Sequence, residues 1–111
     1  MSQLERIAEI IATYGKHGWR LERLLLRPET LIELRESNQE LAKSVAMKEA
    51  SVDALWFSRP SHAEREAWEL RLVSDLQYAL FETFEKDEVE EDREEVRREI
   101  EARLIEHATR S

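Results

Sequence analysis

The sequence predicts an α+β domain in which helices surround an antiparallel sheet of three to four strands. Strands are indicated by Trp68, Leu70 and Leu72, which alternate with charged residues, because a period of two places the apolar side chains on one face. Most of the aromatic residues lie between positions 52 and 85, which marks this stretch as the core. Amphipathic segments at both ends of the chain predict an N-terminal helix and a long acidic C-terminal helix.

An all-α bundle is the alternative architecture. Positions 61–111 contain no glycine or proline, and Trp68, Leu72 and Leu76 begin a series of apolar residues spaced by four. Ala, Glu, Lys, Leu and Arg together supply 63 of the 111 residues, a composition typical of helical proteins. We favour strands, because closely spaced bulky aromatics with strictly alternating charges fit a pleated surface better than a helix.

The first helix is predicted from its capping signals. Ser2 and Glu5 have the spacing of a capping box, in which each side chain binds the backbone N–H of the other residue. Leu4 and Ile7 begin an apolar stripe of about three turns that faces the core. Gly15 is expected to end the helix as its C-cap, because glycine adopts the left-handed conformation without strain.

The next part of the chain predicts a strand followed by short helices. Residues 19–26 are interpreted as a strand that ends in a continuous apolar run. Pro28 suits the first position of a following helix, and Glu29 complements the dipole at its N-terminus. Residues 39–51 fit either a second short helix or an irregular crossing, and we favour the helix.

Three consecutive strands are predicted for the aromatic centre. Residues 52–58 are apolar or small at nearly every position, and Pro60 ends this run. The segment that follows is long enough for a hairpin loop before the strand around residues 68–72. Residues 78–84 are expected to return as the third strand, with Phe81 on the face opposite Trp68.

The C-terminal helix has the plainest pattern in the sequence. Asp87 and Glu90 have capping-box spacing, acidic residues crowd the first turn, and basic residues follow. Val96, Ile100 and Leu104 form a narrow apolar stripe, which is expected to dock on the sheet of the same chain. Such a stripe is also compatible with pairing to another helix.

Length and composition restrict the classes of function. A chain of 111 residues is expected to form a single domain over positions 1–111, and the absence of cysteine excludes disulfides and thiolate chemistry. Residues 1–10 do not have the pattern of a signal peptide and no run is long enough to span a membrane, so we expect a cytoplasmic protein. The net charge of -8 argues against direct nucleic-acid binding.

No stretch of the sequence carries a specific catalytic or metal-binding signature. His17, His62 and His107 each lack a second ligand at the spacing of a metal site on one helix, so we predict no metal and no cofactor. The serine, histidine and aspartate residues do not form a recognisable nucleophile motif. An enzymatic function is therefore not favoured.

The leading functional hypothesis comes from the apolar character of both faces of the predicted sheet. Leu55, Phe57 and Phe81 lie on the second face, and we expect them to contact a protein partner, either a second copy in a homodimer or another protein. The protein is then a small, non-enzymatic interaction protein.

The sequence leaves two alternative functions open. In the first, Trp56, Arg59, Trp68 and Arg71 surround the mouth of a small-ligand or catalytic pocket between the sheet and the helices. The arginines are more readily explained as cross-strand partners of nearby carboxylates. In the second, the acidic segment at positions 87–101 mimics nucleic-acid phosphates and inhibits a partner, although a capped, salt-bridged helix explains the same charges.

Overall fold

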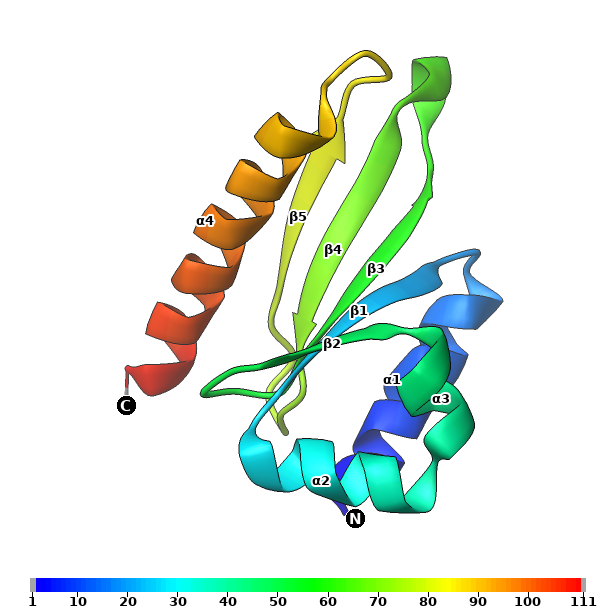
Figure 1. Ribbon diagram of the computed structural model, residues 1–111. Helices are drawn as coiled ribbons and strands as arrows, with labels where there is room; N and C mark the ends of the chain where they lie inside the picture. The colour runs from blue at the N-terminus through cyan, green and yellow to red at the C-terminus, as the bar shows by residue number, and fades with distance from the viewer. Residues whose placement is uncertain (1, 111) are drawn as a thin grey trace.

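The structure is a computed structural model that describes residues 2–110, and it confirms the α+β class. Within these residues, nine helices and strands follow the order α1 (Gln3–Lys16), β1 (Arg20–Leu26), α2 (Pro28–Ser37), α3 (Gln39–Ser44), β2 (Ala46–Glu49), β3 (Ala54–Pro60), β4 (Glu66–Leu72), β5 (Ala79–Phe84) and α4 (Glu90–Thr109) (Figure 1). A single 3-10 turn at His62–Glu64 connects β3 to β4. The strands form one sheet in the order β2-β1-β3-β4-β5.

The predicted run of three antiparallel strands is confirmed, and the all-helical alternative is wrong. Strands β3, β4 and β5 pair antiparallel with their neighbours, and Trp56 lies opposite Leu70 in the register. The sheet has five strands rather than three or four, because residues 39–51 contain both the short helix α3 and the strand β2. Strand β2 pairs parallel to β1, so the sheet is mixed.

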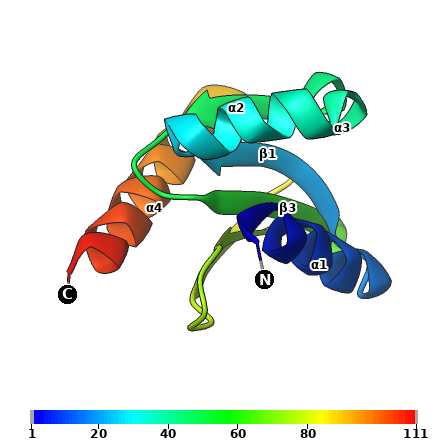
Figure 2. The same ribbon diagram turned by 90° about the horizontal axis from the view of Figure 1, so that it is seen from below.

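Helices cover the two faces of the sheet. Figures 1 and 2 show α4 on one side of the strands, whereas α1 lies on the other side. Trp56 and Leu70 pack with Ile100 of α4 on the first side. Leu55 and Phe57 pack with residues of α1 and α2 on the second side. The central strands are therefore covered on both faces by their own chain.

The apolar run at the end of β1 shows why this strand is central. Leu24 and Leu26 belong to the core under α1 and α2, whereas Leu25 belongs to the core under α4. All three side chains are at most 1% exposed. A continuous apolar run is the pattern expected of a strand that is buried on both faces.

One helix boundary of α1 follows the sequence-based prediction and the other does not. The capping box of Ser2 and Glu5 is present, with both backbone N–H groups bonded. The prediction that Gly15 ends α1 as a C-cap is wrong, because the helix continues to Lys16 and is capped by His17. Gly18 is the glycine with a positive φ, of 83°, so the left-handed turn comes three residues later than predicted.

The prediction of a capping box at the start of α4 is also wrong. The helix begins at Glu90, and Val89 precedes it without a side-chain hydrogen bond to the first turn. Glu88 instead accepts a hydrogen bond from the backbone N–H of Glu85 at 2.7 Å, which stabilises the preceding turn. The acidic residues of the first turn still interact favourably with the helix dipole.

Helix α4 is fixed to the sheet by a buried carboxylate as well as by apolar packing. Glu101 accepts a hydrogen bond from the indole N–H of Trp56 on β3 at 2.8 Å. Its other oxygen pairs with the ammonium group of Lys48 on β2 at 2.9 Å. A third contact, of 3.5 Å, joins Glu101 to Arg23 on β1. One side chain thus connects α4 to three strands.

Within residues 2–110, no helix is both long enough and apolar enough to cross a membrane.

Candidate binding surfaces

The four residues predicted to surround a ligand pocket do not lie together. Trp56 and Trp68 are on the face of the sheet covered by α4. Arg59 and Arg71 occupy odd positions of the same strands, so they project from the opposite face. The sheet separates the two pairs, and the predicted pocket is not formed.

Each of the four residues has a structural contact instead. Trp56 and Trp68 pack edge to face, with ring centroids 5.8 Å apart. The guanidinium of Arg59 lies 4.4 Å from the centre of the Trp19 ring and donates to the carbonyl of His17. Arg71 donates to a neighbouring backbone carbonyl.

The alternative explanation for the arginines, pairing with Asp53 and Glu69, is also not what the structure contains. Asp53 is paired with Arg27. Glu69 accepts a hydrogen bond from the hydroxyl of Tyr14 on α1. The Tyr14 ring stacks on the Phe57 ring, with the two ring centroids 4.1 Å apart. Tyr14 is half-buried by this packing. Burial, together with the neighbouring carboxylate, raises the pKa of Tyr14 to about 12.

The raised pKa of Tyr14 predicts a loss of stability at alkaline pH. The neutral phenol is favoured in the folded state, so its contribution is complete below pH 10 and is lost as the pH rises towards 12. We expect the free energy of unfolding to fall by about 1 kcal/mol over this interval, which allows for solvent screening of a half-buried side chain. The measurement is urea denaturation at a series of pH values.

Two variants isolate the contribution of this side chain. Tyr14→Phe removes the ionisable group and is expected to flatten the alkaline decline. Glu69→Gln removes the nearby negative charge, so the pKa of Tyr14 should move back towards 10 in an ultraviolet titration of tyrosinate. An unchanged alkaline decline in Tyr14→Phe would show that another group is responsible.

The three residues predicted to contact a partner have very different positions. Leu55 and Phe57 are completely buried beneath α1 and α2, so they are not available to another molecule. Phe81 on β5 is 59% exposed. The difference arises because α1 and α2 pack on β1 and leave the outer strand β5 uncovered on this face. Of the predicted interface, only Phe81 is accessible.

Phe81 adjoins an unpaired edge of the sheet. The N–H of Leu72 donates to the carbonyl of Tyr78 at 2.9 Å, so these opposite residues form a hydrogen-bonded pair. Antiparallel ladders alternate with a period of two, and the backbone groups of Ala79, Phe81 and Thr83 therefore point to the free side of β5. The N–H of Thr83 accordingly bonds to the side chain of Glu82 rather than to β4.

The two edges of the sheet differ in how well they are protected. Strand β2 has only four residues, and two of them, Lys48 and Glu49, are charged. Short length and charge both discourage pairing with another strand. Strand β5 has six residues, contains no proline or lysine, and carries the exposed ring of Phe81. It is the edge with the weaker protection against strand addition.

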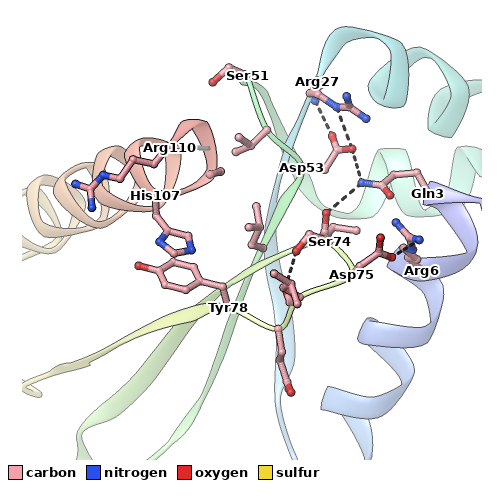
Figure 3. A pocket seen from close by; sticks show the side chains of 16 residues that line it. Gln3, Arg6, Arg27, Ser51, Asp53, Ser74, Asp75, Tyr78, His107 and Arg110 are labelled. Carbon is pink, nitrogen blue, oxygen red and sulfur yellow. Dashed lines mark hydrogen bonds and ion pairs between the residues drawn. The ribbon is translucent and has the colours of Figure 1, made fainter.

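A separate cleft of about 890 Å³ lies between the C-terminal end of α4 and the N-terminal end of α1 (Figure 3). Its remaining wall is formed by residues 51–53, which precede β3, and by the connection between β4 and β5, which projects between the two helix ends in Figure 2. Its polar and aromatic lining includes Arg6, Arg27, Asp53, Tyr78, His107 and Arg110.

Asp53 holds one side of this cleft together. One carboxylate oxygen accepts from the backbone N–H of Arg27 at 2.8 Å. The other accepts from the Gln3 amide at 2.8 Å and from the Thr30 hydroxyl at 2.9 Å. The backbone carbonyl of Asp53 accepts from the N–H of Val73. Because these partners come from α1, α2 and the β4–β5 connection, Asp53 is a structural junction whose carboxylate is already occupied.

The acidic segment proposed as a phosphate mimic is partly neutralised within the chain. The hydrogen bond from Arg97 lowers the pKa of Glu90. Partial burial acts to raise the pKa of Glu94, but hydrogen bonds from Arg23 and Arg97 outweigh it, and the pKa is lowered. Glu101 is buried. These carboxylates are therefore committed to internal ion pairs.

Sequence reasoning did not identify the cleft or the free edge. Tyr78, His107, Arg6 and Arg27 are far apart in the sequence and match no motif, so only the fold brings them together. Comparisons with protein-family models, with curated proteins and with solved structures found no match.

Proposed function

We propose that this protein is a non-enzymatic interaction protein that acts as a homodimer, in which the β5 strands of two copies pair antiparallel. The observation that carries the proposal is the unprotected edge of β5, with the exposed ring of Phe81 beside it. An edge of this kind is a template for strand addition.

The edge is complementary to itself. Ala79, Phe81 and Thr83 are the residues of β5 whose backbone N–H and C=O groups point to its free side, and Phe81 is the middle one of the three. A two-fold axis through that position would place Ala79 opposite Thr83 of the other copy and would bring the two Phe81 rings together. Aromatic cross-strand pairs of this type stabilise antiparallel sheets.

The position of α4 supports the same arrangement. This helix packs over β4 and β5, so a shared sheet would place two antiparallel α4 helices on one face. With strands about 4.8 Å apart, the helix axes would lie about 10 Å apart, which is close to a normal packing distance. Helix pairing would add buried area that two short strands alone do not supply.

Charges along α4 favour the antiparallel order. Phe84 lies next to Arg97, and Tyr78 stacks on His107, so the middle of β5 is level with the middle of α4. In this order the acidic first half of each helix, with exposed Glu91 and Glu95, would face the less acidic second half of the other, which contains exposed Arg103 and Glu106, so the two most acidic segments are kept apart.

The dimer is tested by light scattering after size exclusion over a range of protein concentrations. Phe81→Glu should give a monomer, because it places two negative charges opposite each other at the centre of the interface. Ile32→Glu is the matched control, since Ile32 is a comparably exposed apolar residue, 56% exposed, on α2. This variant should remain a dimer.

Two results would overturn the proposal. One is a wild-type protein that stays monomeric at its highest soluble concentration. The other is a dimer that Phe81→Glu leaves intact, because the interface must then lie elsewhere. Circular dichroism on both variants establishes that the fold is retained.

A further inference from the structure

The cleft between α1 and α4 forms a second surface, distinct from the β5 edge. We propose that it binds an uncharged compound that carries a planar ring. Its volume of about 890 Å³ falls within the range of ligand pockets, which is about 300–1,000 Å³. Three features of its lining favour this class of ligand, namely an apolar floor, an aromatic wall and charged residues that already pair with one another.

The floor of the cleft is apolar because it lies where the two cores of the domain meet. Val52 and Leu72 belong to the core under α4, whereas Val73 belongs to the core under α1 and α2, and all three line the cleft. Leu76, on the connection between β4 and β5, also lines it and is 82% exposed. A ligand that covers these residues removes apolar surface from water, which favours binding.

One wall of the cleft is aromatic. The rings of Tyr78 and His107 stack at a centroid distance of 3.6 Å and an interplanar angle of 4°. Figure 3 shows the pair at the α4 side of the cleft. His107 is exposed on the last turn of α4, whereas Tyr78 is partly buried at the base of β5. A planar ligand ring can pack against this pair, because aromatic stacking tolerates many ring types.

The arginines and aspartates of the cleft are already paired within the chain. Arg6 pairs with Asp75, Arg27 with Asp53 and Glu29, and Arg110 with Glu106. Figure 3 shows the guanidinium groups of Arg27 and Arg110 turned away from the space between Asp53 and Tyr78. A charged ligand would have to break one of these pairs to gain a counter-ion, or remain unpaired in the cleft, and both are costly. An uncharged ligand meets neither cost.

A probe series on one ring separates the effect of charge from the effect of the ring. Indole-3-acetamide is uncharged, indole-3-acetate is its anionic analogue, and tryptamine is a cationic one. Adenosine and adenosine 5′-monophosphate form a second pair of an uncharged and an anionic compound. We expect indole-3-acetamide or adenosine to bind with a Kd of about 1 mM or tighter, as is normal for ligands of this size. Its charged analogues should bind at least about tenfold more weakly.

Nuclear magnetic resonance locates the bound compound and gives its Kd. In nitrogen–proton correlation spectra, the backbone amide signals of Val73 and Tyr78 should shift as the uncharged compound is added. The signals of β2, at the opposite edge of the sheet from β5, should not shift.

Variants of His107 test the aromatic wall. His107→Ala should weaken the uncharged compound about tenfold through loss of a stacking surface. His107→Phe keeps a flat ring and should bind like the wild type. His62→Ala, in the turn at the far end of β3, is the matched control, because His62 is also exposed and does not line the cleft. Circular dichroism establishes that each variant is folded.

Three results would overturn the proposal. The first is that neither indole-3-acetamide nor adenosine shifts the signals of the cleft. The second is that a charged analogue binds as tightly as the uncharged compound. The third is that His107→Ala binds as tightly as His62→Ala, or that His107→Phe loses as much affinity as His107→Ala. The outcome does not depend on dimerisation, because Phe81→Glu should bind the uncharged compound normally.

Discussion

Replacing Asp53 with alanine is expected to reduce the free energy of unfolding by about 3–5 kcal/mol. The side chain is 1% exposed, so the donors that it satisfies are removed from water. Without the carboxylate, the Gln3 amide, the Thr30 hydroxyl and the backbone N–H of Arg27 all lose their acceptor. Each buried group left without a partner costs about 1–3 kcal/mol. Urea denaturation followed by circular dichroism measures the loss.

Asp75→Ala is the matched control for this prediction. Asp75 lines the same cleft, but its side chain is 81% exposed, and its ion pair with Arg6 is at the surface. Surface pairs contribute about 0–1 kcal/mol, so this variant should remain close to the wild type. Equal stabilities of Asp53→Ala and Asp75→Ala would show that the hydrogen bonds around Asp53 do not stabilise the junction between α1, α2 and β3.

The local periodicity of the sequence was sufficient to predict most of the elements. The alternation around Trp68 identified β4, and the spacing from Ser2 to Glu5 identified the start of α1. Strand β2 was missed because its four residues carry a weak apolar pattern, and its partner β1 lies on the far side of two helices in the sequence. Parallel pairing depends on such distant contacts, which a local pattern does not contain.

The candidate binding surfaces were less predictable because they depend on how the helices cover the sheet. Alternation correctly placed Leu55, Phe57 and Phe81 on one face. It did not reveal that α1 and α2 cover the first two and leave Phe81 exposed. The same alternation does exclude a pocket that combines Trp56 with Arg59, because even and odd positions of one strand face opposite sides. The cleft residues were not identified, since no sequence spacing relates Tyr78 to His107.

Replacing Arg97 with alanine should also cost about 3–5 kcal/mol. Its side chain is 3% exposed, and it pairs with Glu90 at 2.7 Å and with Glu94 at 3.0 Å. The guanidinium lies 4.1 Å from the centre of the Trp68 ring, which compensates for an Nε atom that has no hydrogen-bond partner within residues 2–110. Alanine would leave the two carboxylates without this cation and open a gap between α4 and β4. Arg98→Ala, on the exposed side of the same turn, should change stability by less than about 0.5 kcal/mol.

The acid limb of the stability curve gives an independent test of Arg97. Its hydrogen bonds help to lower the pKa of Glu90 and of Glu94 below the ordinary value of 4.5. A lowered pKa in the folded state contributes stability that is present above 4.5 and is lost as the pH falls through the folded-state value. Without Arg97, both pKa values should rise and this part of the acid-dependent loss should shrink, whereas Arg98→Ala should keep the wild-type profile. A variant that loses stability at neutral pH but keeps the full acid-dependent loss would mean that Arg97 stabilises α4 through its packing on Trp68 and not through its charge.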